Sequence, residues 1–217
     1  MISILLPTFN GEKYLSLAIE SVLNQSFKDF ELLIAFNGTI DNSKEIPSKY
    51  NDSRIKVFDY GDDKGKSRTL NKLLNEAKFD WIALQDDDDI WVNNKLEKQI
   101  DYLNKGWDVI GTFINYINEE GQITGRPNLC SFTDDIKHLS LSGMNQVANT
   151  STVFKKEVAL EIGGWTEGID GIEDYDFWLR LLRRDKKFTN LPEELVHHRL
   201  HSNSNFNTKK YDLNKVL

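Results

Sequence analysis

Four short apolar runs alternate with helical patterns in the first half of the chain, and this alternation limits the possible folds more than any other feature. The runs are residues 2–6 (ISILL), 31–35 (ELLIA), 55–58 (IKVF) and 81–84 (WIAL). Runs of this length and composition are typical of strands that are covered on both faces. Strands that alternate with helices predict βαβ units with right-handed crossovers. We therefore expect an α/β fold with a doubly wound, mostly parallel sheet.

Helices are indicated between these runs by apolar residues three and four positions apart. One set is Leu15, Ala18, Ile19, Val22 and Leu23, and a second set is Leu70, Leu73, Leu74 and Ala77. Each set forms a single stripe on a helix, which predicts that both helices pack one face inward.

The pattern becomes more mixed from about residue 108. Residues 108–117 and 122–125 flank an Asn-Glu-Glu-Gly turn, which predicts a hairpin. The elements expected after it are a strand at 150–154, a helix at 155–164 closed by glycines, an amphipathic helix at 171–184 and a strand at 195–200.

Composition and charge narrow the class of protein. The chain has 217 residues, of which 39% are hydrophobic, enough for one substantial core and hence one domain or a domain with an appendage. The formal net charge of -7, without a long basic run, disfavours nucleic-acid binding. No apolar stretch approaches the roughly 18 residues of a membrane span and no leader pattern begins the sequence, so we expect a cytoplasmic protein.

Polar residues follow three of the predicted strands at the point where each strand ends. Residues 7–11 (PTFNG) follow the first strand, residues 36–41 (FNGTID) the second, and Asp86 to Asp89 the fourth. The carboxyl ends of parallel strands meet at one edge of an open α/β sheet, and ligands bind there. We therefore expect these three segments to converge on one site.

The four consecutive aspartates indicate a cation site. Adjacent carboxylates repel one another, and a hard divalent cation makes such a cluster favourable, so the run predicts Mg²⁺ or Mn²⁺ beside a diphosphate. A solvated acidic loop is the alternative, and the apolar anchors on both sides of the run favour the site. An EF-hand calcium loop is excluded, because Ile90 and Trp91 stand where that loop needs an oxygen ligand and a glycine.

Together these motifs resemble those of family 2 glycosyltransferases, which are nucleotide-diphospho-sugar transferases of the GT-A fold. The matching segments are PTFNGEKYLSLAIESVLNQSFKDFELLI, NGTIDNS, GKSRTLNKLLNEAKFDWIALQDDDDIW, GGW, EDYDFWLRL and HRLHSNS. They span nearly the whole chain, and their order and spacing are more specific than any one of them. The resemblance implies a Rossmann-like nucleotide-sugar-binding half at residues 1–107, a mixed acceptor-binding and catalytic-base half at 108–205, and a tail at 206–217.

For the donor, the resemblance implies that Pro7, Phe9 and Glu12 lie beside the nucleoside and that Asn37 lies near the base. Many relatives carry two aspartates where this chain has Phe36-Asn37. An amide therefore replaces a carboxylate at the base, and the nucleotide preference stays open.

Arg68 is the candidate phosphate contact on the helix that follows. The Arg-Asn pair common in the family is Leu70-Asn71 here, and Arg68 lies two residues earlier, as in a Lys/Arg-Ser/Thr-Leu-Asn variant of the family. The resemblance implies that Arg68 approaches the phosphates of the donor. A solvated arginine at a helix start is the alternative.

Asp86, Asp87 and Asp88 match the DxD motif of the family. The resemblance implies that Asp88 binds Mn²⁺ or Mg²⁺ directly and that Asp86 and Asp87 lie near the ribose or the sugar. His201 resembles a late histidine that reaches the metal or the diphosphate in some members, and an exposed loop histidine is the alternative.

Asp174 is the candidate general base. It shares a helix face with Phe177, Trp178 and Leu181, so its side chain is expected to point inward. An acid that only stabilises the start of the helix is the alternative, and this role suits Glu173 better. The resemblance makes Asp174 the group that takes a proton from an acceptor hydroxyl in a single inverting displacement.

On the acceptor side the candidates are Trp165 and Glu173, with core packing as the alternative for the indole. The resemblance implies metal-dependent, inverting transfer from a nucleoside-diphosphate sugar, preferably a UDP-sugar, to a glycan or lipid-linked acceptor at the inner face of a bacterial membrane. Two alternatives are a sugar-1-phosphate nucleotidyltransferase and a non-catalytic sugar-nucleotide-binding module. Residues 7–12 lack the glycine-rich, basic loop of the former, and the presence of both Asp88 and Asp174 argues against the latter.

Overall fold

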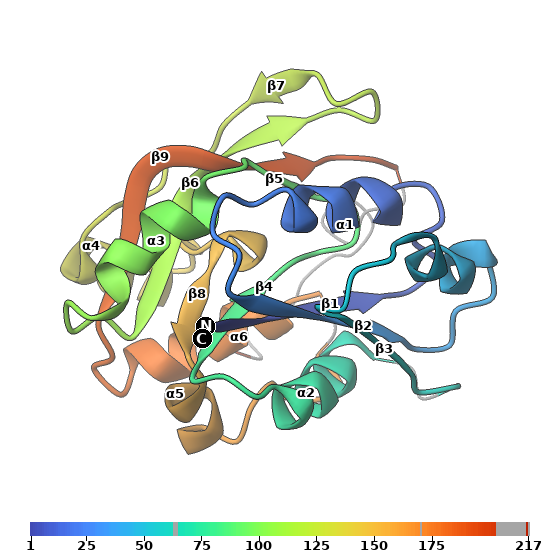
Figure 1. Cartoon of the computed structure of the whole chain (residues 1–217). Helices are drawn as coiled ribbons and strands as arrows, with labels where there is room; N and C mark the ends of the chain where they lie inside the picture. The colour runs from blue at the N-terminus through green and yellow to red at the C-terminus, as the bar shows by residue number, and fades with distance from the viewer. Residues whose placement is uncertain (63–64, 170, 203–215, 217) are drawn as a thin grey trace.

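A computed structural model describes residues 1–62, 65–169, 171–202 and 216 of the chain (Figure 1). The strands are β1 (Ile2–Thr8), β2 (Phe30–Phe36), β3 (Ile55–Asp59), β4 (Trp81–Leu84), β5 (Ile90–Trp91), β6 (Val109–Ile117), β7 (Ile123–Gly125), β8 (Val153–Lys155) and β9 (Phe188–Arg199). The helices are α1 (Leu15–Leu23), α2 (Lys66–Glu76), α3 (Lys95–Leu103), α4 (Thr133–Leu141), α5 (Lys156–Glu161) and α6 (Glu173–Leu182), with 3-10 turns η1 (Asn42–Glu45), η2 (Pro47–Lys49) and η3 (Asn149–Ser151). The predicted tail at 206–217 lies outside the described residues, except for Val216.

One mixed sheet runs through the molecule in the strand order β3-β2-β1-β4-β8-β6-β9-β5, with β7 paired to β6. The pairs β1–β2, β1–β4, β2–β3 and β6–β9 are parallel. The strands β8, β5 and β7 pair in the antiparallel direction. The predicted α/β fold with a mostly parallel sheet is confirmed, and so is the hairpin of β6 and β7.

Apolar side chains form a core on each face of the sheet, because successive residues of a strand point to opposite faces. In β2, Leu32 and Ile34 pack with α1 and α3 on one face, whereas Leu33 and Ala35 pack with α2, α5 and α6 on the other. The helices α1 and α2 accordingly lie on opposite sides of β1 and β2 in Figure 1. With both faces covered, the strand ends are left as the place where polar side chains gather.

The long strand β9 runs from the interior of the sheet to the edge where the aspartates lie. It pairs with β6 along both its halves, and the register shifts where Pro192 lacks an N–H group for the ladder. Its last residues pair with β5, with Ile90 opposite His197. Because β5 directly follows the aspartate run, this pairing brings the end of β9 beside Asp88 and Asp89.

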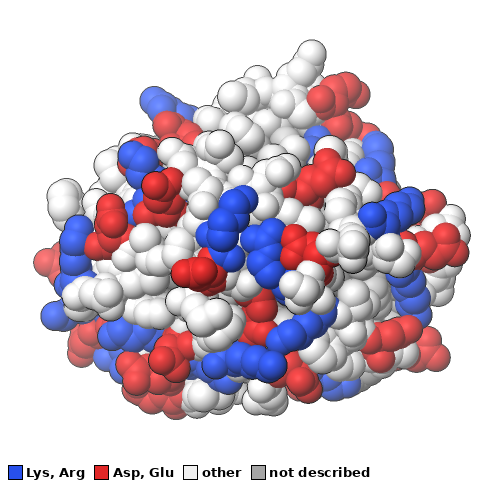
Figure 2. Space-filling model, viewed as in Figure 1, with Lys and Arg blue, Asp and Glu red and all other residues white. Residues whose placement is uncertain are grey.

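Charged side chains of both signs are interspersed over the face of the molecule seen in Figure 2. Such mixing is usual for a surface that keeps a protein dispersed in water. Within the described part of the chain, no helix combines the length and apolar character that a membrane crossing requires.

Candidate active site

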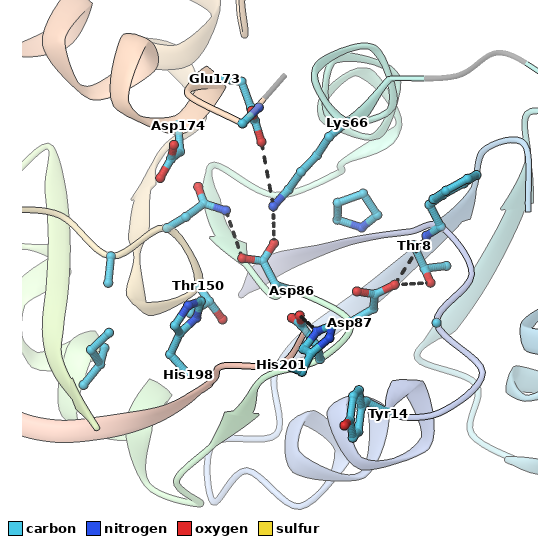
Figure 3. Close-up of a pocket in the computed structure, with 18 of the residues that line it drawn as sticks. Thr8, Tyr14, Lys66, Asp86, Asp87, Thr150, Glu173, Asp174, His198 and His201 are labelled. Carbon is cyan, nitrogen blue, oxygen red and sulfur yellow. Dashed lines mark hydrogen bonds and ion pairs between the residues drawn. The ribbon is translucent and has the colours of Figure 1, made fainter. Parts of the chain in front are cut away.

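The carboxyl ends of β1, β2 and β4 border one cavity of about 1090 Å³. Its lining includes Pro7, Phe9, Asn37 and the segment from Asp86 to Asp88. Other parts of the wall come from the first turns of α2 and α6, from β6, from segments within 127–150, and from the residues around the end of β9 (Figure 3). The three polar segments that the sequence predicted to converge therefore do so.

Asp87 is fixed by the loop that follows β1. Its carboxylate accepts hydrogen bonds from the Thr8 hydroxyl and from the Phe9 N–H, the latter at 3.3 Å. A Cβ atom at Gly11 would lie 2.6 Å from Thr8 Oγ1 and 2.7 Å from Asp87 Oδ2, so this approach requires glycine. Burial, followed by the charge of Asp88, raises the pKa of Asp87 to about 7. The loop thus holds Asp87 at the cavity wall without help from a ligand.

Asp88 and His201 form a pair at the same wall. His201 Nε2 lies 2.9 Å from Asp88 Oδ2, and each side chain is less than a quarter exposed. Burial opposes the charge of Asp88, but the hydrogen bond from His201 and the nearby cations hold the pKa of Asp88 below its ordinary value. The same hydrogen bond raises the pKa of His201. Asp88 is therefore ionised at neutral pH.

Asp89 and His198 form a second pair, which the sequence analysis did not single out. His198 Nδ1 lies 2.9 Å from Asp89 Oδ2, while Asp89 Oδ1 accepts the N–H of Arg199 at 2.8 Å. Burial disfavours a charge on His198, but the buried carboxylate of Asp89 outweighs this and raises the pKa of His198 to about 9. The contact depends on the pairing of β5 with β9, so no local sequence signal indicates it.

Lys66 links the aspartate run to the helix that carries the candidate base. Its Nζ atom lies 2.6 Å from Asp86 Oδ1 and 4.0 Å from Glu173 Oε1 (Figure 3). Burial opposes the charge of Lys66, but Asp86 and Glu173 outweigh burial and raise the pKa of the lysine. The sequence analysis missed this residue. Its place in the first turn of a helix that starts at the ligand edge is the only signal that the sequence gives.

Asp174 lies in the first turn of α6 and lines the cavity. Burial, and then the charge of Glu173, raises the pKa of Asp174 to about 7. A carboxyl group with this pKa can exchange a proton near neutral pH, as a general base must. Figure 3 shows Asp174 and Glu173 on one side of the cavity and Asp87 and His201 on the other. The acids of α6 and the aspartate run thus border the same cavity.

Trp165 is not among the residues that line the cavity, and its predicted contact with an acceptor is not seen in the structure. The side chain is 2% exposed and stacks on Phe177 with ring centroids 4.3 Å apart. Phe154 packs against the same ring at 6.2 Å. The aromatic core under α6 therefore accounts for Trp165.

Arg68 and Glu12 also lie outside the cavity lining. Arg68 pairs at the surface with Glu167 at 2.9 Å, because a residue two positions after Lys66 projects about 200° further around the helix. Its predicted approach to the phosphates is therefore not seen. Glu12 accepts a hydrogen bond from the Asn42 side chain at 2.8 Å and so joins two loops at the rim.

The comparison with known families decides the identity of the fold. A family model described as Glycosyl transferase family 2 matches residues 3–163. The chain belongs to this family. It is a glycosyltransferase, as the motifs predicted, and the nucleotidyltransferase and the non-catalytic module fall away as alternatives.

Relatives of this family 2 glycosyltransferase come from several bacteria and an archaeon. The O-antigen biosynthesis glycosyltransferase WbnJ of Escherichia coli is 32% identical, over 94% of this chain and 81% of that protein. The UDP-Glc:alpha-D-GlcNAc-diphosphoundecaprenol beta-1,3-glucosyltransferase WfgD of Escherichia coli is 29% identical, over 84% of this chain and 70% of that protein.

Solved structures share the fold of this glycosyltransferase. S. aureus TarS 1-349 in complex with UDP-GlcNAc superimposes with a TM-score of 0.77 at 17% identity, over 96% of this chain and 61% of that one. The mannosyltransferase PcManGT of Pyrobaculum calidifontis, in complex with GDP-Man and Mn2+, gives 0.71 at 12% identity, over 94% of this chain and 58% of that one. This chain thus spans about three fifths of the length of these neighbours.

The carboxylate oxygen of Asp88 suits Mn²⁺ or Mg²⁺, and the imidazole nitrogen of His201 favours a transition-metal ion such as Mn²⁺ over Mg²⁺. A carboxylate oxygen and an imidazole nitrogen meet at the cavity, 2.9 Å apart. Within the described ranges, no group of three or more His, Cys, Asp or Glu side chains forms a closed metal-binding cluster. Two protein ligands leave most of the coordination shell to phosphate oxygens and water, which is the usual way that a nucleotide-bound cation is held.

Proposed function

We propose that the enzyme transfers a sugar, with inversion and in the presence of Mn²⁺ or Mg²⁺, from a UDP-sugar to a hydroxyl of a glycan or lipid-linked acceptor. One observation carries this proposal. The ionised Asp88 with its partner His201 and the carboxyl group of Asp174, with a pKa of about 7, line the same cavity. Asp88 can thus hold a cation at the leaving diphosphate, while Asp174 can accept the proton of the attacking hydroxyl.

Names of relatives support the two substrate classes. WfgD is named for a UDP-Glc donor and a diphosphoundecaprenol-linked acceptor, and TarS 1-349 is described in complex with UDP-GlcNAc. WbnJ is named for O-antigen biosynthesis. We accordingly place the reaction in cell-surface polysaccharide synthesis, at the inner face of a membrane. Residues 1–107 supply most of the donor side, and residues 108–205 supply the base and the acceptor side.

The proton transfer is the step that the side chains of this chain explain best. Asp174 accepts the proton of the acceptor hydroxyl as that oxygen forms its bond to the anomeric carbon. The bond from the anomeric carbon to the diphosphate oxygen breaks on the opposite face, and the electron pair leaves with UDP. Because one displacement occurs, no second nucleophilic carboxylate is required and the anomeric configuration inverts.

The remaining residues bind and orient. Asp88 and His201 would hold the cation, which supplies positive charge for the departing diphosphate. Pro7, Phe9 and Asn37 border the part of the cavity that we assign to the nucleoside. Figure 3 shows Asp86 between His201 and Glu173, and we assign the transferred sugar to this part of the cavity.

A thermal-shift screen tests the donor assignment. The Tm of the protein is measured with UDP, GDP, CDP, UDP-glucose and UDP-GlcNAc, each with and without Mn²⁺. We expect the uridine compounds to give the largest increase and Mn²⁺ to enlarge it, because a ligand that binds only the folded state stabilises it. Equal shifts for all nucleotides, or none, would contradict the assignment to a UDP-sugar.

The pH dependence of turnover follows from the raised pKa of Asp174. Only the ionised carboxylate accepts a proton, so kcat/KM is expected to rise about tenfold per pH unit below about pH 7 and to level off above it. The measurement is UDP release from UDP-glucose or UDP-GlcNAc, whichever gives the larger thermal shift. A profile that stays flat from about pH 5.5 to pH 8 would remove Asp174 from this role.

A further inference from the structure

Lys66 lies between the aspartate run that follows β4 and the first turn of α6. It enters from the first turn of α2, whereas Asp86 follows β4 and Glu173 begins α6. Lys66 joins α2 to both of these segments, with its Nζ atom 2.6 Å from Asp86 Oδ1 and 4.0 Å from Glu173 Oε1. Asn149 of η3 adds a hydrogen bond of 3.5 Å to the second oxygen of Asp86. These contacts join Asp86, which we assign to the transferred sugar, to α6, the helix that carries Asp174.

Lys66 also lies close to the first turn of α6 that carries Asp174, because its Nζ atom is 4.0 Å from Oε1 of Glu173, the residue before Asp174. Burial is the main reason for the raised pKa of Asp174, and the charged groups that act on its carboxyl group beside it include Glu173 on the same helix, Lys66 from α2 and Asp86 from the end of β4. The two carboxylates disfavour ionisation of Asp174, and Lys66 favours it. Lys66 is 29% exposed in its side chain, so water screens its field only in part. Without this cation, Asp174 would share its surroundings with two uncompensated carboxylates.

We propose that Lys66 is a positioning residue that holds Asp86 and Glu173 in place across the cavity and keeps Asp174 ionised for proton abstraction. The proposal rests on the proposed role of Asp174 as the base. Lys66 acts through these acids. It differs from Arg68, the cation that the motif favoured, because Arg68 projects from the other side of α2 toward Glu167.

The pH profile of Lys66 variants tests the proposal. Lys66→Met is expected to move the acid limb of the kcat profile to higher pH by about 0.5–1 unit, because removing a nearby cation disfavours the carboxylate. Lys66→Arg retains the charge and is expected to restore the wild-type limb. Lys72→Met removes a cation from the same helix outside the cavity lining, where Lys72 lies over the Tyr60 ring at 4.6 Å, and its limb should match the wild type.

A second readout needs no substrate. The difference in Tm between Lys66→Met and Lys66→Met/Asp174→Asn, followed against pH, reports the ionisation of Asp174 in the folded protein. The upper inflection of this Tm difference marks the folded-state pKa of Asp174. It should lie at higher pH than the inflection of the Tm difference between the wild type and Asp174→Asn. If both the acid limb and this inflection stay at their wild-type pH in Lys66→Met, the proposal is wrong. Failure of the proposed function looks different, since turnover would then persist in Asp174→Asn.

Discussion

Asp174→Asn is expected to lower kcat for sugar transfer by about 10²–10⁴-fold and to leave the Kd for UDP with Mn²⁺ unchanged. The amide keeps the size of the side chain but cannot accept the proton of the acceptor hydroxyl. The donor side of the cavity, around Asp87 and Asp88, is untouched by the substitution. Stopped or steady-state assays of UDP release give kcat, and calorimetry gives the Kd.

Although Asp174→Asn is expected to lower kcat, it is expected to raise the stability of the folded protein above neutral pH. The folded-state pKa of Asp174, about 7, lies above its ordinary value of 3.8, so the folded state binds the proton more tightly than the unfolded state. Stability therefore falls as the pH rises from about 4 to 7 and stays reduced above it. Asparagine has no charge to bury, so Asp174→Asn should raise Tm by a few degrees at pH 8 and change it little at pH 4.

Asp135→Asn is the matched control for this variant. Asp135 lies in the first turn of α4 and is exposed, so it is an acid that only stabilises the start of a helix. Its replacement should lower Tm slightly and leave kcat at the wild-type level. If Asp174→Asn behaved like Asp135→Asn in both measurements, Asp174 would be an ordinary helix-terminal acid.

The strands and the ligand edge could be predicted because their signals are local. Each apolar run is contiguous, and a parallel sheet places the ends of its strands at one edge whatever the loops do. The convergence of Pro7, Asn37 and the aspartate run follows from that rule alone. The spacing of the apolar residues of α6 likewise predicted which face of the helix points inward, and Asp174 lies on that face.

The residues that the sequence analysis missed or misplaced depend on contacts between distant segments. Asp89 meets His198 only because the short strand β5 pairs with the end of β9. Whether Lys66 or Arg68 faces the cavity depends on the rotation of α2 about its axis. The sequence shows two cations in one helical turn and does not indicate that rotation. The sequence is equally compatible with Trp165 in contact with a sugar ring and with Trp165 in the core. The stacking on Phe177 shows that it is in the core.

Asp88→Ala is expected to remove the effect of Mn²⁺ on UDP binding. In the wild type, Mn²⁺ should tighten UDP binding because the cation joins the carboxylate of Asp88 to the diphosphate. In the variant, this gain should shrink by at least about tenfold, since one of two protein ligands is lost. Calorimetric titration of UDP with and without Mn²⁺ measures the gain directly, and Asp101→Ala, which removes an exposed acid of α3, should retain it.

The metal-free titration distinguishes loss of a ligand from loss of the fold. Asp88 is held ionised by His201, so without a cation it repels the diphosphate of UDP. Its removal should therefore leave metal-free UDP binding as strong as in the wild type, or stronger, whereas a damaged fold would weaken binding in both conditions. A variant that still responds to Mn²⁺ as the wild type does would show that the cation is held by other groups, and the assignment of Asp88 and His201 as its ligands would then be wrong.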